Sequence, residues 1–276
     1  MMHSCAIVGK SGSGRTFVAT HVAAALAYMG VRTLLVGCDT KPDAARAFSS
    51  APAPSLLQAF QEAGGPPPGG LNTVVATITP YLDVMETGPT PLGQGNHGQL
   101  LQEVLDFLDG HDARERYQHI VFDLNEERFD SAWMPVLKAV SAVIGVTTED
   151  PGALFVLNRM ARGVLLANYE GDAPARLLGV INNRSLGTGL FRAYVERTRF
   201  FPLVEIPEHS ALGALRATRQ TLFSFDPEPR EFKAVVDGLV QIGDAIRTGS
   251  YAMQPAGPLE DDVIWQLGAS AGLRLV

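Results

Sequence analysis

Short apolar runs alternate with longer helical segments along most of this chain. The apolar runs are rich in Val, Ile and Leu, which is typical of strands that are buried on both faces. Strands that alternate with helices predict an α/β fold, with a largely parallel, twisted sheet and helices on both of its faces. The predicted strands are 5–8, 32–36, 81–86, 119–122, 142–147, 177–181 and 203–206, and the predicted helices are 16–29, 55–62, 98–108, 152–167 and 231–246.

The alternation continues without an internal repeat or a second core-sized segment. We therefore expect a single nucleotide-binding domain over residues 1–248 and a separate C-terminal tail over residues 249–276. The segment 63–70, A-G-G-P-P-P-G-G, contains too much Gly and Pro for regular structure, so we expect an exposed loop there.

Composition narrows the class of protein. The chain has 276 residues, 46% of them hydrophobic and 18% charged, which is enough to bury a full core. No apolar run reaches the roughly 18 residues of a membrane-spanning helix, and residues 1–4 lack the pattern of a signal peptide, so we expect a cytoplasmic protein. The two cysteines, Cys5 and Cys38, are expected to be reduced and buried. A net charge of −7 argues against general binding of nucleic acid or anionic membranes.

The segment 9–16, G-K-S-G-S-G-R-T, follows the first predicted strand and opens the first predicted helix. It matches the phosphate-binding loop G-x-x-x-x-G-K-[ST] except that Arg15 replaces lysine. The backbone N–H groups of such a loop and the helix N-terminus bind phosphate, which predicts a P-loop NTPase fold that binds ATP or ADP. A Gly/Ser-rich turn that arises by chance is the alternative. Because a planar guanidinium is bulkier than an ammonium, we expect nucleotide binding to survive and hydrolysis to be slow.

Four polar residues at the predicted nucleotide site are candidates for catalysis or for magnesium. Thr16 stands where a P-loop hydroxyl binds Mg²⁺. Asp123 ends a predicted strand and could hold Mg²⁺ through water, with a helix cap or loop aspartate as the alternative. Asp39 could orient the attacking water and Lys41 could sense the terminal phosphate, with a plain turn as the alternative.

These motifs resemble those of a known group of proteins. Segment 9–16 resembles the deviant Walker A motif of the ParA/MinD/nitrogenase iron-protein group. Segment 36–43, V-G-C-D-T-K-P-D, is similar to the G-C-D-P-K-x-D of nitrogenase iron proteins and of the iron-protein subunits of protochlorophyllide and chlorophyllide reductases. Further motifs match in order along nearly the whole chain, at 85–89 (M-E-T-G-P), 93–98 (G-Q-G-N-H-G), 122–123 with 134–135, 181–184 (I-N-N-R), 206–209 (I-P-E-H) and 258–259 (P-L).

The resemblance implies a homodimer in which two ATP sites face each other. Lys10 would reach the partner's nucleotide, Asp39 would position water, and Asn183 would contact adenine. Binding and hydrolysis of ATP would shift two switch regions, near 39–43 and 123–131. The other nucleotide-binding positions implied are Gly9, Ser11, Gly12, Ser13, Gly14, Arg15, Thr16, Phe17, Lys41, Pro207, Glu208 and His209, with Thr16 and Asp123 at magnesium.

The chain departs from this family at the [4Fe–4S] cluster, which family members bind with two cysteines from each subunit. The first cysteine position is Asn96 here, and the second falls near Phe129 or Asp130, so neither supplies a thiolate. The family's docking arginine is replaced by Gln99. Neither cysteine of the chain can take over, since both belong to strand ends beside the P-loop. We therefore expect no iron–sulfur cluster.

A retained nucleotide site beside a lost redox site favours an ATP-dependent dimeric switch that assists, regulates or matures a partner protein. A nucleotide-binding module that does not hydrolyse ATP is the alternative, and Arg15 favours it. A third interpretation is a ParA/MinD-like positioning ATPase on DNA or a membrane. Segment 259–267 has apolar residues at helical spacing, but its acidic residues 260–262 have the wrong sign for anionic lipid. A tail that packs on its own dimer or on a partner fits better.

Overall fold

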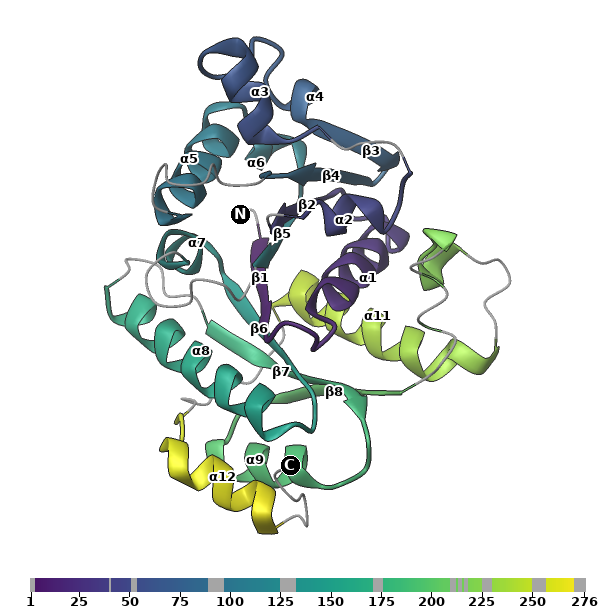
Figure 1. Ribbon diagram of the computed structural model, residues 1–276. Coiled ribbons are helices and arrows are strands. Elements are labelled where there is room, and N and C mark those ends of the chain that lie inside the picture. Colours follow the sequence, from purple (N-terminus) through teal and green to yellow (C-terminus); the bar gives the residue numbers. More distant parts are fainter. Residues whose placement is uncertain are drawn as a thin grey trace.

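The computed structural model describes residues 3–39, 41–50, 54–88, 97–124, 133–170, 176–208, 212, 215, 218–224, 230–249 and 257–270. Its centre is an eight-stranded sheet in the order β3-β4-β2-β5-β1-β6-β7-β8 (Figure 1). Neighbouring strands are parallel, except that the edge strand β3 runs antiparallel to β4. The strands are β1 (His3–Gly9), β2 (Thr33–Cys38), β3 (Val75–Thr79), β4 (Leu82–Glu86), β5 (His119–Leu124), β6 (Ala142–Thr147), β7 (Arg176–Ser185) and β8 (Pro202–Pro207).

Helices connect the parallel strands and cover both faces of the sheet (Figure 1). Parallel neighbours need such crossovers, because a tight turn cannot return the chain to the same end of a sheet. The helices are α1 (Arg15–Tyr28), α2 (Asp43–Arg46), α3 (Leu56–Ala63), α4 (Leu71–Val74), α5 (His97–Gly110), α6 (Ala113–Arg116), α7 (Met134–Ala139), α8 (Pro151–Glu170), α9 (Leu190–Thr198), α11 (Lys233–Thr248) and α12 (Asp261–Ser270).

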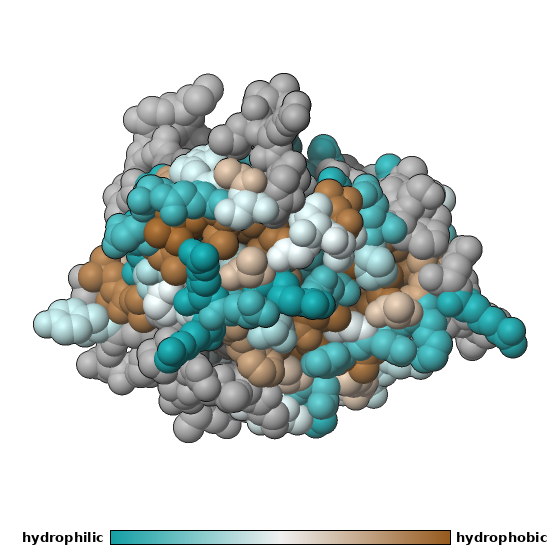
Figure 2. Space-filling model, turned by 90° about the horizontal axis from the view of Figure 1, so that it is seen from below, coloured by the Kyte–Doolittle hydropathy of each residue, from teal (hydrophilic) through white to brown (hydrophobic). Residues whose placement is uncertain are grey.

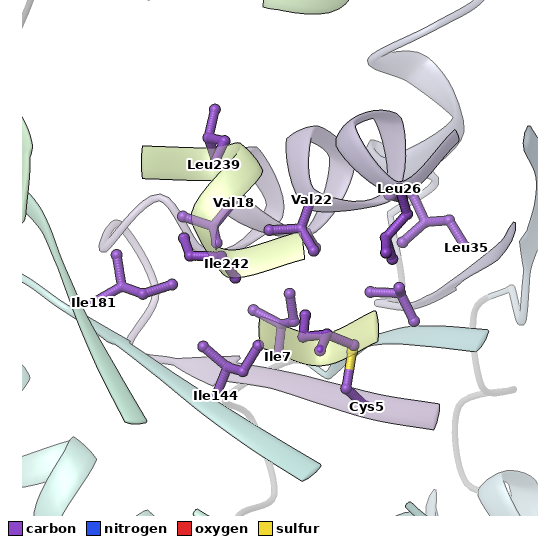
Figure 3. Close-up of a cluster of buried hydrophobic side chains, with 14 of the residues drawn as sticks. Cys5, Ile7, Val18, Val22, Leu26, Leu35, Ile144, Ile181, Leu239 and Ile242 are labelled. Carbon is purple, nitrogen blue, oxygen red and sulfur yellow. The ribbon is translucent and has the colours of Figure 1, made fainter. Parts of the chain in front are cut away.

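Two hydrophobic layers fix these helices to the sheet. On one face, Val18 and Val22 of α1 and Ile242 of α11 pack over strand residues such as Ile7 and Ile144 (Figure 3). On the other face, α5, α7 and α8 bury a second cluster that is centred on large aromatic and aliphatic side chains. The inner strands β1, β2, β5 and β6 are almost entirely buried, which is why their sequences are continuous apolar runs.

The described part of the predicted tail, residues 257–270, packs against the domain. Ile264 and Leu267 of α12 are buried in a third cluster with α8 and α9. The side chain of Asn158 on α8 accepts a hydrogen bond from the Leu259 N–H and donates one to the Leu259 carbonyl, both at 2.7 Å. The apolar residues of this helix therefore face their own chain. On the surface seen in Figure 2, hydrophobic residues are interrupted by hydrophilic ones.

The predicted strands and helices are all present, with ends that differ by a few residues. The structure adds elements that the apolar pattern does not predict, among them β3, α7 and α9. The Gly/Pro-rich segment 63–70 is mostly exposed and irregular, as expected. Among the described residues, no helix is both long and apolar enough to span a lipid bilayer.

Candidate nucleotide-binding site

The P-loop runs from the end of β1 at Gly9 to the start of α1 at Arg15. Gly12 and Gly14 have φ values of +82° and +80°, a backbone conformation that favours glycine. A Cβ at Gly9 would meet the carbonyl oxygen of Val146 on β6, and a Cβ at Gly14 would meet the Asn183 amide. The glycines therefore let the loop lie against neighbouring strands, with the first turn of α1 and its N–H groups directly behind it.

Asn183 holds this loop in place. Its side-chain nitrogen, from β7, donates a hydrogen bond of 2.7 Å to the Ser13 carbonyl. The Ser13 N–H in turn donates to the Lys10 carbonyl at 3.0 Å. The family resemblance implies that Asn183 contacts adenine, and this stays a prediction; in the structure its amide donates to the P-loop.

The Ser13 hydroxyl is buried and has no hydrogen-bond partner among the described residues. Buried hydroxyl groups are rarely left without a partner in folded proteins. An unpartnered hydroxyl in the middle of a phosphate-binding loop fits a site that an anionic ligand completes.

Arg15, Asp123 and Asp39 form an ion triad behind the loop, in which Arg15 and Asp123 are buried and Asp39 is partly exposed. The Nε of Arg15 donates to Asp123 Oδ1 at 2.6 Å, and its NH2 group donates to Asp39 Oδ2 at 3.2 Å. The side chains of Arg15 and Asp123 are only 8% and 2% exposed, and that of Asp39 is 24% exposed. Burial alone would lower the pKa of Arg15, but the two carboxylates outweigh this effect and raise the pKa. The guanidinium is therefore a permanent buried cation.

Strand register explains why these residues meet. Asp123 of β5 is paired with Ile7 of β1 on one side and with Gly37 of β2 on the other. The aspartate thus lies between the strand that leads into the P-loop and the strand that leads to Asp39. All three strands are parallel, so their carboxyl ends meet at the edge where ligands of open α/β sheets bind.

In the structure, Lys10 forms an ion pair with Asp150 of the same chain. Its Nζ lies 3.0 Å from Asp150 Oδ2, and the same oxygen accepts a hydrogen bond of 2.9 Å from the Ala153 N–H. Partial burial would raise the pKa of Asp150, but Lys10 and nearby backbone N–H groups lower it. Asp150 was not predicted as a site residue. The signal was an aspartate in the short connection between a predicted strand and a predicted helix, three residues after the end of β6 and directly before α8.

Glu86 is a second residue that the sequence reasoning missed. It is fully buried at the end of β4, and its Oε1 accepts a hydrogen bond of 2.6 Å from the Ala45 N–H in α2, just after Asp39 and Lys41. The pKa of Glu86 is raised to about 8, mainly by burial and also by nearby aspartates, while the hydrogen bond from the Ala45 N–H acts in the opposite direction. Glu86 is therefore mostly protonated at neutral pH, and its hydrogen bond with Ala45 connects β4 to α2.

Residues 3–272 match the model of the 4Fe-4S iron sulfur cluster binding proteins of the NifH/frxC family. The chain belongs to the NifH/frxC family. The light-independent protochlorophyllide reductase iron-sulfur ATP-binding protein of Halorhodospira halophila is 26% identical over 271 residues, which cover 95% of this chain and 86% of that relative. The family resemblance proposed from the motifs is confirmed.

Solved structures of the ParA/MinD group share the fold of this NifH/frxC member. A ParA family ATPase from Chlorobium tepidum TLS has a TM-score of 0.67 at 19% identity and covers 87% of this chain and 99% of its own. The septum site-determining protein MinD complexed with Mg-ADP from Pyrococcus horikoshii OT3 has a TM-score of 0.67 at 18% identity, over 88% and 96% of the two chains. The predicted α/β fold of a P-loop NTPase is therefore confirmed.

The two cysteines do not fit the cluster after which the NifH/frxC family is named. Cys5 on β1 and Cys38 on β2 are 0% and 1% exposed. Burial raises the pKa of Cys5 to about 12 and, with nearby carboxylates, raises that of Cys38 well above its ordinary value. Cluster iron needs thiolates that two subunits can share, and these thiols lie inside the sheet. The positions 96, 129 and 130 lie outside the described residues.

Magnesium is the other group that the NifH/frxC fold implies. In P-loop sites it is held by the P-loop hydroxyl, here Thr16, and by a Walker-B aspartate, here Asp123. Thr16 is partly exposed on the first turn of α1. The Asp123 carboxylate, however, is already paired through Oδ1 with the Arg15 guanidinium, so its charge is offset by a side chain of the protein, which does not match the expected magnesium role.

The remaining expected site residues lie around the same edge of the sheet. Lys41 is exposed, and its N–H donates to Asp39 Oδ1 at 3.3 Å. Pro207 and Glu208 are exposed at the end of β8, which pairs with the strand of Asn183. The ring of Phe17 lies tilted against the ring of His21, with centroids 4.0 Å apart, and packs against the core. His209 lies outside the described residues.

Proposed function

We propose that this NifH/frxC family member is an ATP-binding, nucleotide-switched homodimer without a [4Fe–4S] cluster, which assists, regulates or matures a partner protein in the cytoplasm. The observation that carries the proposal is the glycine-rich P-loop, whose buried Ser13 hydroxyl has no partner in the described part of the chain, beside cysteines that are buried in the sheet. A loop of this shape binds phosphate through its backbone, and the chain offers no exposed thiol for electron transfer.

In this proposal, several residues take separate roles at the nucleotide. The loop 9–14 binds the phosphates, and Asn183 keeps the loop in shape. Asp39 orients the attacking water, and Lys41 senses the terminal phosphate of ATP. Lys10 leaves Asp150 and reaches the partner's nucleotide when two copies come together.

Binding of ATP is tested by calorimetry with a matched pair of glycine variants. Gly14→Ala should lose at least tenfold in ATP affinity, because the methyl group meets Asn183 and the φ value of +80° is strained. Gly30→Ala has a similar φ of +77°, but open space around it and a place at the far end of α1. It should keep the wild-type affinity. Absence of ATP binding by the wild-type protein would overturn the proposal.

The absence of a cluster is tested separately, by anaerobic iron and sulfide analysis after careful reconstitution. We expect no stoichiometric iron. About four irons per dimer would contradict this part of the proposal.

A module that binds nucleotide without hydrolysing it is a second candidate, and the buried Arg15 triad favours it. The Arg15 guanidinium is bonded to Asp123 and also to Asp39, the residue proposed to orient the attacking water, so Asp39 is less able to act on that water. A steady-state ATPase assay separates the two candidates. Measurable hydrolysis that Lys10→Ala and Asp39→Ala both abolish supports the switch. An Arg15→Lys variant with unchanged turnover would show that Arg15 does not limit the rate.

A further inference from the structure

We propose that Arg15 takes the place of Mg²⁺ as the counter-cation of Asp123, so that the phosphates of ATP bind at this P-loop without a divalent ion. The inference rests on the proposed function, since it concerns how the same site accepts ATP. It starts from the disagreement between the expected magnesium role of Asp123 and the partner that the structure gives this residue.

The first step is the charge at the site. Asp39 and Asp123 both face the region behind the P-loop, and an unneutralised pair of carboxylates would repel a triphosphate. In most P-loop sites a divalent cation removes this repulsion. Here a guanidinium lies within hydrogen-bond distance of both carboxylates, at 2.6 Å and 3.2 Å, so the neutralising cation belongs to the chain itself.

The second step is burial. Arg15 is 7% exposed and Asp123 is 1% exposed, so the pair is withdrawn from water. To replace Arg15 as the counter-charge of Asp123, a hydrated metal ion would have to displace the guanidinium from its shorter hydrogen bond to Oδ1 while that guanidinium remained buried. A buried charge without its partner is strongly unfavourable. Magnesium therefore competes poorly for this carboxylate.

The third step is the shape of the guanidinium. Arginine has five N–H groups in a rigid planar fork, and within the described part of the chain two of them donate to the carboxylates. In the proposal, the remaining N–H groups donate through the P-loop to phosphate oxygens when ATP binds, a pairing that guanidinium groups form readily. A lysine ammonium is a single point charge and cannot hold both carboxylates and a phosphate in the same way.

The experiment is calorimetry of ATP binding to the full-length protein, in excess EDTA and in excess MgCl₂. For the wild type we expect affinities that differ by less than about threefold between the two buffers. For Arg15→Lys we expect binding at least tenfold tighter with magnesium than with EDTA, because Asp123 is then released to the metal. Arg197→Lys, an exposed arginine on α9, is the matched control and should behave like the wild type.

Each outcome has a distinct meaning. Wild-type binding that needs magnesium by tenfold or more would overturn the inference and leave the proposed function intact. No binding in either buffer would overturn the proposed function and the inference together. Circular dichroism checks that Arg15→Lys is folded, and if it is not, the wild-type comparison decides alone.

Discussion

Asn183 shows how a single side chain can fix the shape of a phosphate-binding loop. It is 5% exposed and its amide spans from β7 to the Ser13 carbonyl at 2.7 Å. The Asn183→Ala variant would leave that carbonyl buried without a donor, and we expect unfolding free energy to fall by about 1–3 kcal/mol. Urea denaturation measures the loss. Gln99→Ala, at an exposed position on α5, should change stability by less than about 0.5 kcal/mol. Equal effects of the two variants would contradict this role.

Glu86 should make stability depend on pH. Its pKa rises from 4.5 to about 8 on folding, mainly because it is buried. The native state therefore holds a proton that the unfolded chain releases between these values, so this contribution to stability is complete below pH 4.5 and disappears as pH rises to about 8. The Glu86→Gln variant is neutral throughout, so its stability relative to the wild type should rise by about 4 kcal/mol on going from pH 5 to pH 8.5.

Urea unfolding of both proteins at the two pH values measures this difference. The control is Glu103→Gln, which changes an exposed glutamate on α5 and should follow the wild type at both pH values. Parallel pH profiles for wild type and Glu86→Gln would contradict the assignment of the buried proton to Glu86.

At the scale of single residues, the sequence predicted the positions of the site but not their pairings. The P-loop, Asp39 and Asp123 are visible as motifs after apolar runs. The contact between Arg15 and Asp123 depends on β5 lying between β1 and β2, and the contact of Glu86 with α2 depends on β4 lying beside β2. Such neighbours are far apart in the chain, and periodicity does not report them.

At the scale of elements, a substitution in the buried face of α12 tests whether this C-terminal helix stabilises the fold. Ile264 is fully buried between α12 and the pair α8 and α9. Ile264→Ala should lower the unfolding free energy by about 2–4 kcal/mol, because it leaves a cavity in a packed cluster. Thermal and urea unfolding measure the effect. Gln266→Ala, exposed on the same helix, should have almost none. Stability unchanged by Ile264→Ala would mean that α12 does not pack as described.

The elements also show where an apolar pattern succeeds and where it fails. The inner strands of the sheet are continuous apolar runs because helices cover both of their faces, and all of them were predicted. The edge strand β3, with the sequence V-A-T-I-T, is only partly buried, so its pattern is mixed. The helix α9 contains arginine, glutamate and threonine among a few buried residues. Those buried residues pack in a cluster with α8 and α12, which are distant in the chain, so the local sequence pattern does not reveal the helix.

For the whole molecule, the pair of Lys10 with Asp150 should oppose dimer formation, if Lys10 acts on the partner's nucleotide as proposed. Both side chains are partly exposed, at 38% and 53%, so the contact is weak enough to open. Asp150→Asn should lower the ATP concentration needed for half-maximal dimer by about two- to fivefold, while Lys10→Ala should prevent the ATP-dependent dimer. Light scattering after size-exclusion chromatography measures both.

A second lysine–aspartate contact gives the matched control for this prediction. Lys233 and Asp237 on α11 are also exposed and 3.0 Å apart, and neither belongs to the predicted nucleotide site. Asp237→Asn should leave the ATP titration of the dimer unchanged. If Asp150→Asn and Asp237→Asn gave the same titration, Lys10 would not be restrained by Asp150.

The burial of Cys5 and Cys38 has a consequence for the conditions in which the protein can work. Oxidants attack thiolates, and these sulfurs are both enclosed by the sheet and held as neutral thiols. Oxygen and peroxide should therefore oxidise neither cysteine readily. If the chain binds no cluster, as we propose, its nucleotide site of backbone amides and a guanidinium should bind ATP equally well in air and under anaerobic conditions.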